Sequence, residues 1–116
     1  MPGPGGEGGV ETPIVVVALL KLKAGTAAEA IDAFRPVVEK THTERGCQAY
    51  ALHRDGGDPD TIVLIEKWAS QADLDAHFVK PYIEDLGELS SKLLAEPPRI
   101  LFCEPLAIGD PSKGMI

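Results

Sequence analysis

The first apolar run of the chain, IVVVALLKLK at residues 14–23, constrains the fold more than any other feature. It is rich in β-branched residues and has the length of a strand. Alternate residues of a strand point to opposite sides of a sheet, and here both sets are apolar. A sheet with helices on one side and water on the other would instead alternate apolar and polar residues. We therefore expect both faces of this strand to be covered.

Three further strands are indicated elsewhere in the chain. Alternating or apolar runs predict strands at residues 46–55, 61–69 and 99–108. The turn-forming sequence GGDPD at residues 56–60 predicts that the first two form a hairpin with a longer loop. Pro105 limits how much of the last strand can pair in the middle of a sheet, because proline has no backbone N–H.

Helical spacing of apolar residues predicts a long helix after the first strand. Thr26 and Glu29 have the spacing of a capping box at its start. Gly46 is expected to end it. Pro36 lies within the pattern and is expected to kink the helix or to break it after Phe34.

Two helices are predicted between the third and fourth strands. Ser70 and Asp73 have the spacing of a capping box, and the short helix that they open is expected to end near Val79. Pro81 suits the first turn of a second helix, and a double proline at residues 97–98 is expected to end it.

The order of these elements, with the two later helices counted together, is β-α-β-β-α-β. The predicted fold class is therefore α+β, a ferredoxin-like βαββαβ unit with an antiparallel sheet. The helices of this unit cover one sheet face, and no residues are left to cover the other. Burial of one apolar side chain contributes roughly 1.5–3 kcal/mol. We therefore expect the bare face to pack on the same face of a second copy, in a two-fold homodimer.

We expect one domain at residues 13–108, with a flexible Gly/Pro-rich tail at residues 1–12 and a second tail at residues 109–116. The formal net charge of −7 argues against nucleic acid as a partner, because phosphate binding requires a cationic surface. No apolar run is long enough to predict a membrane span. Cys47 and Cys103 fall on strands at opposite sheet edges in this unit, so we expect reduced thiols in a cytoplasmic protein.

Two segments of the sequence, ERGCQAYALHRD at residues 44–55 and EKWASQADLDAHF at residues 66–78, resemble the antibiotic biosynthesis monooxygenase family. The residues that carry the resemblance are Glu44, Gly46, Cys47, Tyr50, Glu66, Trp68, Ser70, Leu74 and His77. The resemblance extends over about residues 14–108. It implies a ferredoxin-like fold that pairs into a dimeric α/β barrel.

The resemblance also implies a range of activities. Many members of the family oxygenate phenols or quinols without a metal or a flavin. Others isomerise or cleave small molecules, one branch degrades haem, and several have no known activity. This chain contains no asparagine, whereas the haem-degrading branch and the best-described quinol-oxygenating arrangement each use one. The sequence departs from both patterns at that point.

His77 is the candidate base. It shares a face of the predicted short helix with Leu74 and Phe78, and that face points at the sheet. Histidine titrates near neutral pH and can accept a proton from a substrate. Glu66 and Trp68 share a strand face, so Glu66 is a candidate to orient His77 and to stabilise its protonated form. The alternative is a structural ion pair, with His77 or Arg54 as the partner of Glu66.

Aromatic residues near this pair are the candidates for substrate binding. Trp68 and Phe78 can pack against a flat substrate, and Tyr50 and Tyr82 can donate a hydrogen bond to a substrate oxygen. Ordinary packing is the alternative for each of them. The three histidines lack the spacing of metal ligands, so we expect no metal. The resemblance to family members that use neither a metal nor a flavin implies that no other cofactor is needed.

Two functions remain open. The first is a cofactor-independent monooxygenase that oxidises a small aromatic or quinol-type substrate with O2. The second is a non-catalytic dimer that binds a small molecule, for which a filled core without a cavity near Trp68 and His77 would be the signature. An isomerase that uses the same acid–base pair without O2 is a third possibility.

Overall fold

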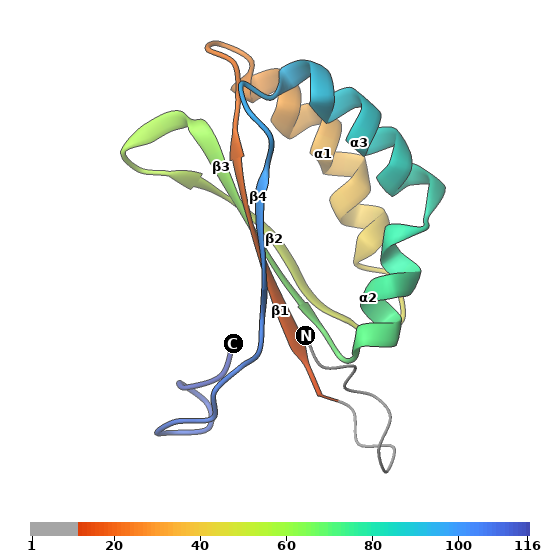
Figure 1. Cartoon of the computed structure of the whole chain (residues 1–116), viewed down its shortest axis with the longest axis vertical. Helices are drawn as coiled ribbons and strands as arrows, with labels where there is room; N and C mark the ends of the chain where they lie inside the picture. The colour runs from red at the N-terminus through yellow and green to blue at the C-terminus, as the bar shows by residue number, and fades with distance from the viewer. Residues whose placement is uncertain (1–11) are drawn as a thin grey trace.

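The structure, a computed structural model, describes residues 12–116, so nearly all of the tail predicted at residues 1–12 lies outside the described residues. A four-stranded antiparallel sheet, with strand order β2-β3-β1-β4, carries helices on one side (Figure 1). The elements are β1 (Ile14–Lys21), α1 (Ala27–Thr41), β2 (Cys47–Asp55), β3 (Asp58–Trp68), α2 (Gln71–Phe78), α3 (Pro81–Leu93) and β4 (Arg99–Cys103). The predicted α+β, ferredoxin-like fold is confirmed.

The two-sided apolar run forms β1, which lies in the interior of the sheet between β3 and β4. Val16, which is 1% exposed, faces the helices and pairs with Glu66 on β3 and Phe102 on β4. Val17 points to the other face and pairs with Ile65 and Leu101. No helix of the described part of the chain covers this second face (Figure 1). The strand register therefore supports the prediction that both faces of β1 are apolar. That a second copy of the chain covers the open face stays a prediction.

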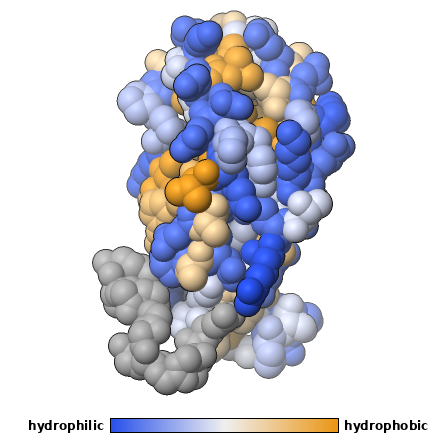
Figure 2. Space-filling model, turned by 90° about the vertical axis from the view of Figure 1, so that its right-hand side faces the viewer, coloured by the Kyte–Doolittle hydropathy of each residue, from blue (hydrophilic) through white to orange (hydrophobic). Residues whose placement is uncertain are grey.

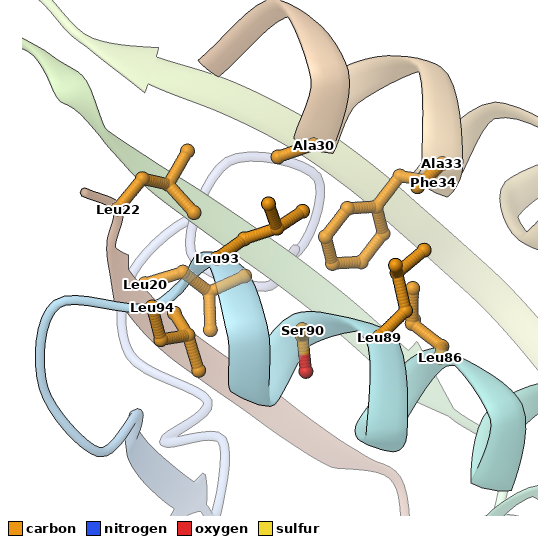
Figure 3. Close-up of a pocket in the computed structure, with 10 residues that line it drawn as sticks. All are labelled: Leu20, Leu22, Ala30, Ala33, Phe34, Leu86, Leu89, Ser90, Leu93 and Leu94. Carbon is orange, nitrogen blue, oxygen red and sulfur yellow. The ribbon is translucent and has the colours of Figure 1, made fainter. Parts of the chain in front are cut away.

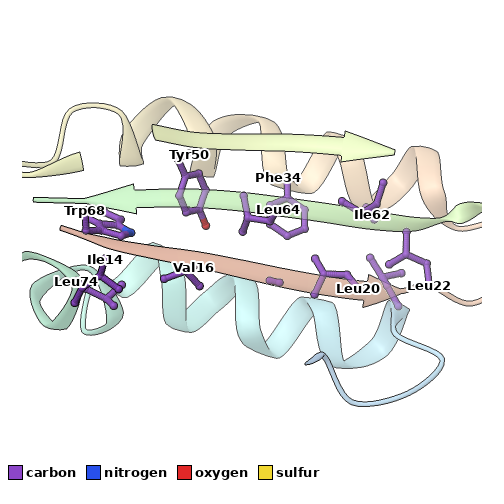
Figure 4. Packing of buried hydrophobic residues seen from close by; sticks show 13 residues of the cluster. Ile14, Val16, Leu20, Leu22, Phe34, Tyr50, Ile62, Leu64, Trp68 and Leu74 are labelled. Atoms are coloured by element: carbon purple, nitrogen blue, oxygen red, sulfur yellow. The ribbon is translucent and has the colours of Figure 1, made fainter. Parts of the chain in front are cut away.

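The core lies between the sheet and the helices (Figure 4). Trp68 and Ile62 on β3 and Leu74 on α2 are almost fully buried. Phe34 of α1 packs over the middle of the same sheet face. On the outer side of the helices, hydrophilic residues dominate and apolar ones gather in smaller patches (Figure 2). None of the described helices is both long enough and apolar enough to cross a membrane.

The structure contradicts three predictions about α1: the break after Phe34, the end near Gly46 and the cap by Thr26. The helix runs unbroken through Pro36, which is exposed, so the carbonyl that loses its hydrogen bond there can face water. It ends at Thr41 rather than near Gly46, which lies in the turn before β2. The Thr26 hydroxyl does not cap the helix but donates to the carbonyl of Lys23 at 2.8 Å.

The β2–β3 hairpin is tighter than predicted. Asp55 pairs with Asp58, so only two glycines separate the strands. The Asp55 carboxylate accepts a hydrogen bond from the backbone N–H of Gly57 at 2.9 Å, which favours this short turn. At the other end, β4 stops at Cys103, two residues before Pro105 and earlier than predicted. Cys47 and Cys103 lie on opposite edge strands and are free thiols, as predicted.

Candidate active site

Residues from four parts of the chain meet at one end of the sheet. His77 lies near the end of α2 and is 2% exposed. Its Nδ1 atom lies 2.9 Å from Oε2 of Glu44, in the turn between α1 and β2, whose side chain is 6% exposed. A carboxylate only accepts, so in the neutral imidazole the bonded Nδ1 carries the proton and the lone pair is on Nε2. The pair therefore presents a base with its orientation and tautomer set.

Tyr82, in the first turn of α3, donates a hydrogen bond to the same Glu44 oxygen. Burial and, after it, the hydrogen bond to the Glu44 carboxylate raise the pKa of Tyr82 to about 12. The Nζ atom of Lys40 lies 5.5 Å from the centre of the Tyr82 ring. Tyr82 is thus held protonated at neutral pH, with its proton directed at Glu44.

Glu66 and Trp68 form a second buried pair on β3. The indole Nε1–H of Trp68 donates to Oε1 of Glu66 at 2.9 Å, and the two residues are 0% and 5% exposed, respectively. Burial raises the pKa of Glu66, although the Trp68 hydrogen bond and the nearby His77 act in the opposite direction. Glu66 was expected to orient His77, but its hydrogen bond goes to Trp68, and the carboxylate bonded to His77 is Glu44.

Aromatic rings surround the His77 imidazole. The ring centres of Trp68, Tyr50 and Phe78 lie 4.6, 5.4 and 5.7 Å from it, respectively. Tyr50 is buried, and the pKa of its phenol is raised by burial and by the Glu66 and Glu44 charges. Phe78 is 41% exposed and contacts Phe102 of β4 edge to face, at 6.2 Å between centres. The rings therefore run from the buried Trp68 to the surface.

The local sequence explains why α2 is held in this place. The Ser70 hydroxyl accepts the backbone N–H of Asp73 at 3.2 Å and donates to its carboxylate at 3.0 Å, so the capping interaction predicted there is confirmed. The Asp73 side chain packs on Gly46, where a Cβ atom would lie 2.2 Å from it. The carbonyl of Gly46 also accepts the N–H of Ala69 at 2.8 Å. Gly46 therefore fixes the start of α2, and with it His77.

Replacing Gly46 with alanine is expected to destabilise the fold by roughly 1–3 kcal/mol, because the residue has a φ of 85° and its new Cβ would collide with Asp73. Denaturant unfolding measures the loss. Gly25→Ala is a matched control, since Gly25 has a φ of 80° but open space around it. An equal loss in the two variants would show that the contact with Asp73 does not matter.

Replacing Glu66 with glutamine is expected to change how stability depends on pH. The raised pKa means that the folded protein holds the Glu66 proton more tightly than the unfolded chain does. This contribution is present below the ordinary carboxyl value of 4.5 and is lost as pH rises through the higher folded value. The free energy of unfolding of the native protein, relative to that of the variant, should therefore fall as pH rises above 4.5. A difference that does not vary with pH would contradict this expectation.

The structure brings five predicted site residues together and places the sixth at their edge. His77, Glu66, Trp68, Tyr50 and Tyr82 share one cluster, and Phe78 lies between it and the surface. Glu44 belonged to the family pattern but had been given no role. The predicted hairpin gave a partial signal, because antiparallel pairing puts the start of β2, just after Glu44, beside the Trp68 end of β3, but it did not give the direction of the Glu44 side chain.

The described residues hold no candidate metal site, and their apolar cavity lies away from the His77 cluster. Within residues 12–116 there is no group of three or more His, Cys, Asp or Glu side chains that could hold a metal ion. An apolar cavity lies between α1, α3 and the far end of β1, away from His77 (Figure 3). It is lined by Leu20, Leu22, Ala30, Ala33, Phe34, Leu86, Leu89, Ser90, Leu93 and Leu94.

Comparison with known protein sequences gives a family model and relatives that agree with one another. Residues 13–88 match the family model for antibiotic biosynthesis monooxygenase. The protein sll1783 of Synechocystis is 34% identical over 79% of this chain, and the chain spans 63% of the length of that relative. YgiN of Escherichia coli, named a probable quinol monooxygenase, is 31% identical over 65% of this chain and 82% of its own.

Solved structures agree with the sequence comparisons. The crystal structure of PA3566 from Pseudomonas aeruginosa superposes with a TM-score of 0.78 and 27% identity. The match covers 86% of this chain and all of that one. Because the family model spans most of the sheet and helices that build the His77 cluster, the chain belongs to the antibiotic biosynthesis monooxygenase family.

Proposed function

We propose that this protein is a cofactor-independent monooxygenase that oxidises a small aromatic, quinol-type substrate with O2. The observation that carries the proposal is the buried Glu44–His77 pair, which leaves Nε2 of His77 free to act as a base. The family membership and the relative named a probable quinol monooxygenase support the same reaction class. In this proposal Glu44 takes the orienting role first expected of Glu66.

The reaction converts a phenol and O2 into a quinone and water. Nε2 of His77 accepts the phenol proton, and the phenolate passes one electron to O2 to give a phenoxyl radical and superoxide. The two radicals combine to form a carbon–oxygen bond at a ring carbon that carries hydrogen. His77 returns its proton to the peroxide, and loss of the ring hydrogen with cleavage of the O–O bond then releases the second oxygen atom as water.

The protein contributes charge placement and exclusion of water in this scheme. The Glu44 carboxylate offsets the positive charge that His77 gains when it accepts the proton. Trp68 and Tyr50 offer flat apolar surfaces against the imidazole. The substrate would approach past Phe78, which is the exposed one of the aromatic residues around His77.

A non-catalytic, dimeric small-molecule-binding protein is the second candidate. The near-complete burial of Trp68 and His77, at 0% and 2% exposure, favours it, because a filled cluster is the expected signature of a binding protein that does no chemistry. The two functions differ in whether O2 is consumed, so a single experiment separates them.

Trp68 is the chain's only tryptophan, so its fluorescence reports directly on ligands near His77. The protein would be titrated with a series of quinols and polyphenols while oxygen uptake is recorded. Quenching with oxygen uptake and an oxygenated product supports the monooxygenase. Quenching without uptake supports the binding protein, and turnover that persists without O2 would identify an isomerase. If no compound in the series causes either quenching or oxygen uptake, the proposal is contradicted.

A further inference from the structure

Tyr82 was expected to donate a hydrogen bond to the substrate, but its proton is already engaged. The phenol donates to Oε2 of Glu44, the same atom that accepts from Nδ1 of His77 at 2.9 Å. A hydroxyl group has a single proton to donate, so Tyr82 cannot hold Glu44 and a substrate oxygen with it at the same time. Its position points to a different task.

We infer that Tyr82 is a positioning residue that acts on His77 through Glu44. This inference rests on the proposed function, in which Nε2 of His77 is the base. A carboxylate on an irregular turn has several accessible side-chain rotamers. The Tyr82 hydrogen bond, from the first turn of α3, holds the Glu44 oxygen against Nδ1. The Nδ1–H tautomer of His77 is then favoured, and Nε2 stays free.

The surroundings of Tyr82 support this role. Thr41, at the end of α1, is 0% exposed, and its hydroxyl has no hydrogen-bond partner among the described residues. It nevertheless lies close enough to Tyr82 to lower the pKa of that phenol. The Thr41 hydroxyl therefore lies beside the Tyr82 phenol, on the buried side of the Glu44–Tyr82 contact. The Nζ atom of Lys40 lies over the Tyr82 ring.

The test is the tautomer of His77, read from the 15N chemical shifts of its ring at a pH where the imidazole is neutral and without substrate. We expect Nδ1–H in the native protein. In Tyr82→Phe the ratio of the Nε2–H to the Nδ1–H form should rise about fivefold, as for the loss of one hydrogen bond. In a turnover assay kcat should fall only by the factor by which the population of the Nδ1–H form falls, with KM unchanged, because only the orientation of the base is affected.

Tyr50→Phe is the matched control. Tyr50 is also buried against the His77 ring, at 5.4 Å between centres, but the only contact it makes with that ring is edge to face. A tautomer shift in Tyr82→Phe but not in Tyr50→Phe supports the inference. No shift in Tyr82→Phe, or equal shifts in both variants, would overturn it. If Tyr82→Phe does not fold, the tautomer is compared in Thr41→Val and Thr41→Ser instead, because the Thr41 hydroxyl lies beside Tyr82. A shift in the valine variant alone supports the inference, and no shift or equal shifts overturn it.

The tautomer is measured without substrate, so it separates this inference from the proposed function. A protein that oxidises no phenol but shows the shift retains Tyr82 as a positioning residue and loses the monooxygenase proposal. A protein that oxidises phenols but shows no shift retains the activity and loses the role of Tyr82.

Discussion

Replacing His77 with alanine is expected to lower kcat/KM for quinol oxidation by about 10²–10⁴-fold, the usual contribution of a general base. The variant has no group at this position that can accept the phenol proton. Without the phenolate, electron transfer to O2 is slow, because the neutral phenol is a much weaker reductant. Oxygen uptake and product formation, measured side by side, report the loss.

The alanine variant also removes the imidazole from the buried Glu44 carboxylate and leaves it only the Tyr82 hydrogen bond, which can destabilise the fold on its own account. His77→Gln is the better-matched variant, since an amide N–H can still donate to Glu44 but the amide cannot act as a base. Circular dichroism and thermal unfolding check that each variant is folded. Product formation at the native rate in a folded His77→Gln protein would remove His77 from the mechanism.

The fold was predictable because its signals are local and periodic. A strand that is apolar on both faces belongs in the interior of a sheet, and β1 lies there, between β3 and β4. Ser70 marks the start of α2, and the three-residue spacing from Leu74 to His77 places both on the face that meets the sheet, where His77 contacts Trp68. The proximity of these two residues therefore followed from spacing alone.

The carboxylate partner of His77 was not predictable in the same way. Glu44 lies in a turn without periodicity, so its side-chain direction depends on tertiary contacts. Glu66 was the expected partner because it shares a strand face with Trp68. That same proximity gives one Glu66 oxygen to the indole N–H instead. The predicted end of α1 was wrong for a related reason. A glycine is required at position 46 by the packing of the Asp73 side chain, not by the end of a helix.

A second copy of the chain is expected to cover the open sheet face, and the substitution Val17→Asp is expected to separate the two copies. Val17 lies on that face, between Ile65 and Leu101 in the neighbouring strands. An unpaired charge buried there would cost roughly 3–5 kcal/mol, and two-fold symmetry places the charge in the interface twice. Analytical ultracentrifugation should therefore show a dimer for the native protein and a monomer for the variant at the same concentration.

The face that forms the dimer is identified by placing the same charge on different surfaces and asking which variants remain dimers. Val79→Asp introduces an identical change at a residue that is 70% exposed on the side of the helices, so it should leave the dimer intact. Leu101→Asp gives a second change on the open face at a residue that is already 40% exposed in the single chain, where it need not disturb the protomer itself. If both Val17→Asp and Leu101→Asp remain dimers with native affinity, the copies meet on another surface. A native chain that sediments as a folded monomer would show that β1 tolerates an open apolar face, and the rule that led from its sequence to a dimer would then be wrong for this protein.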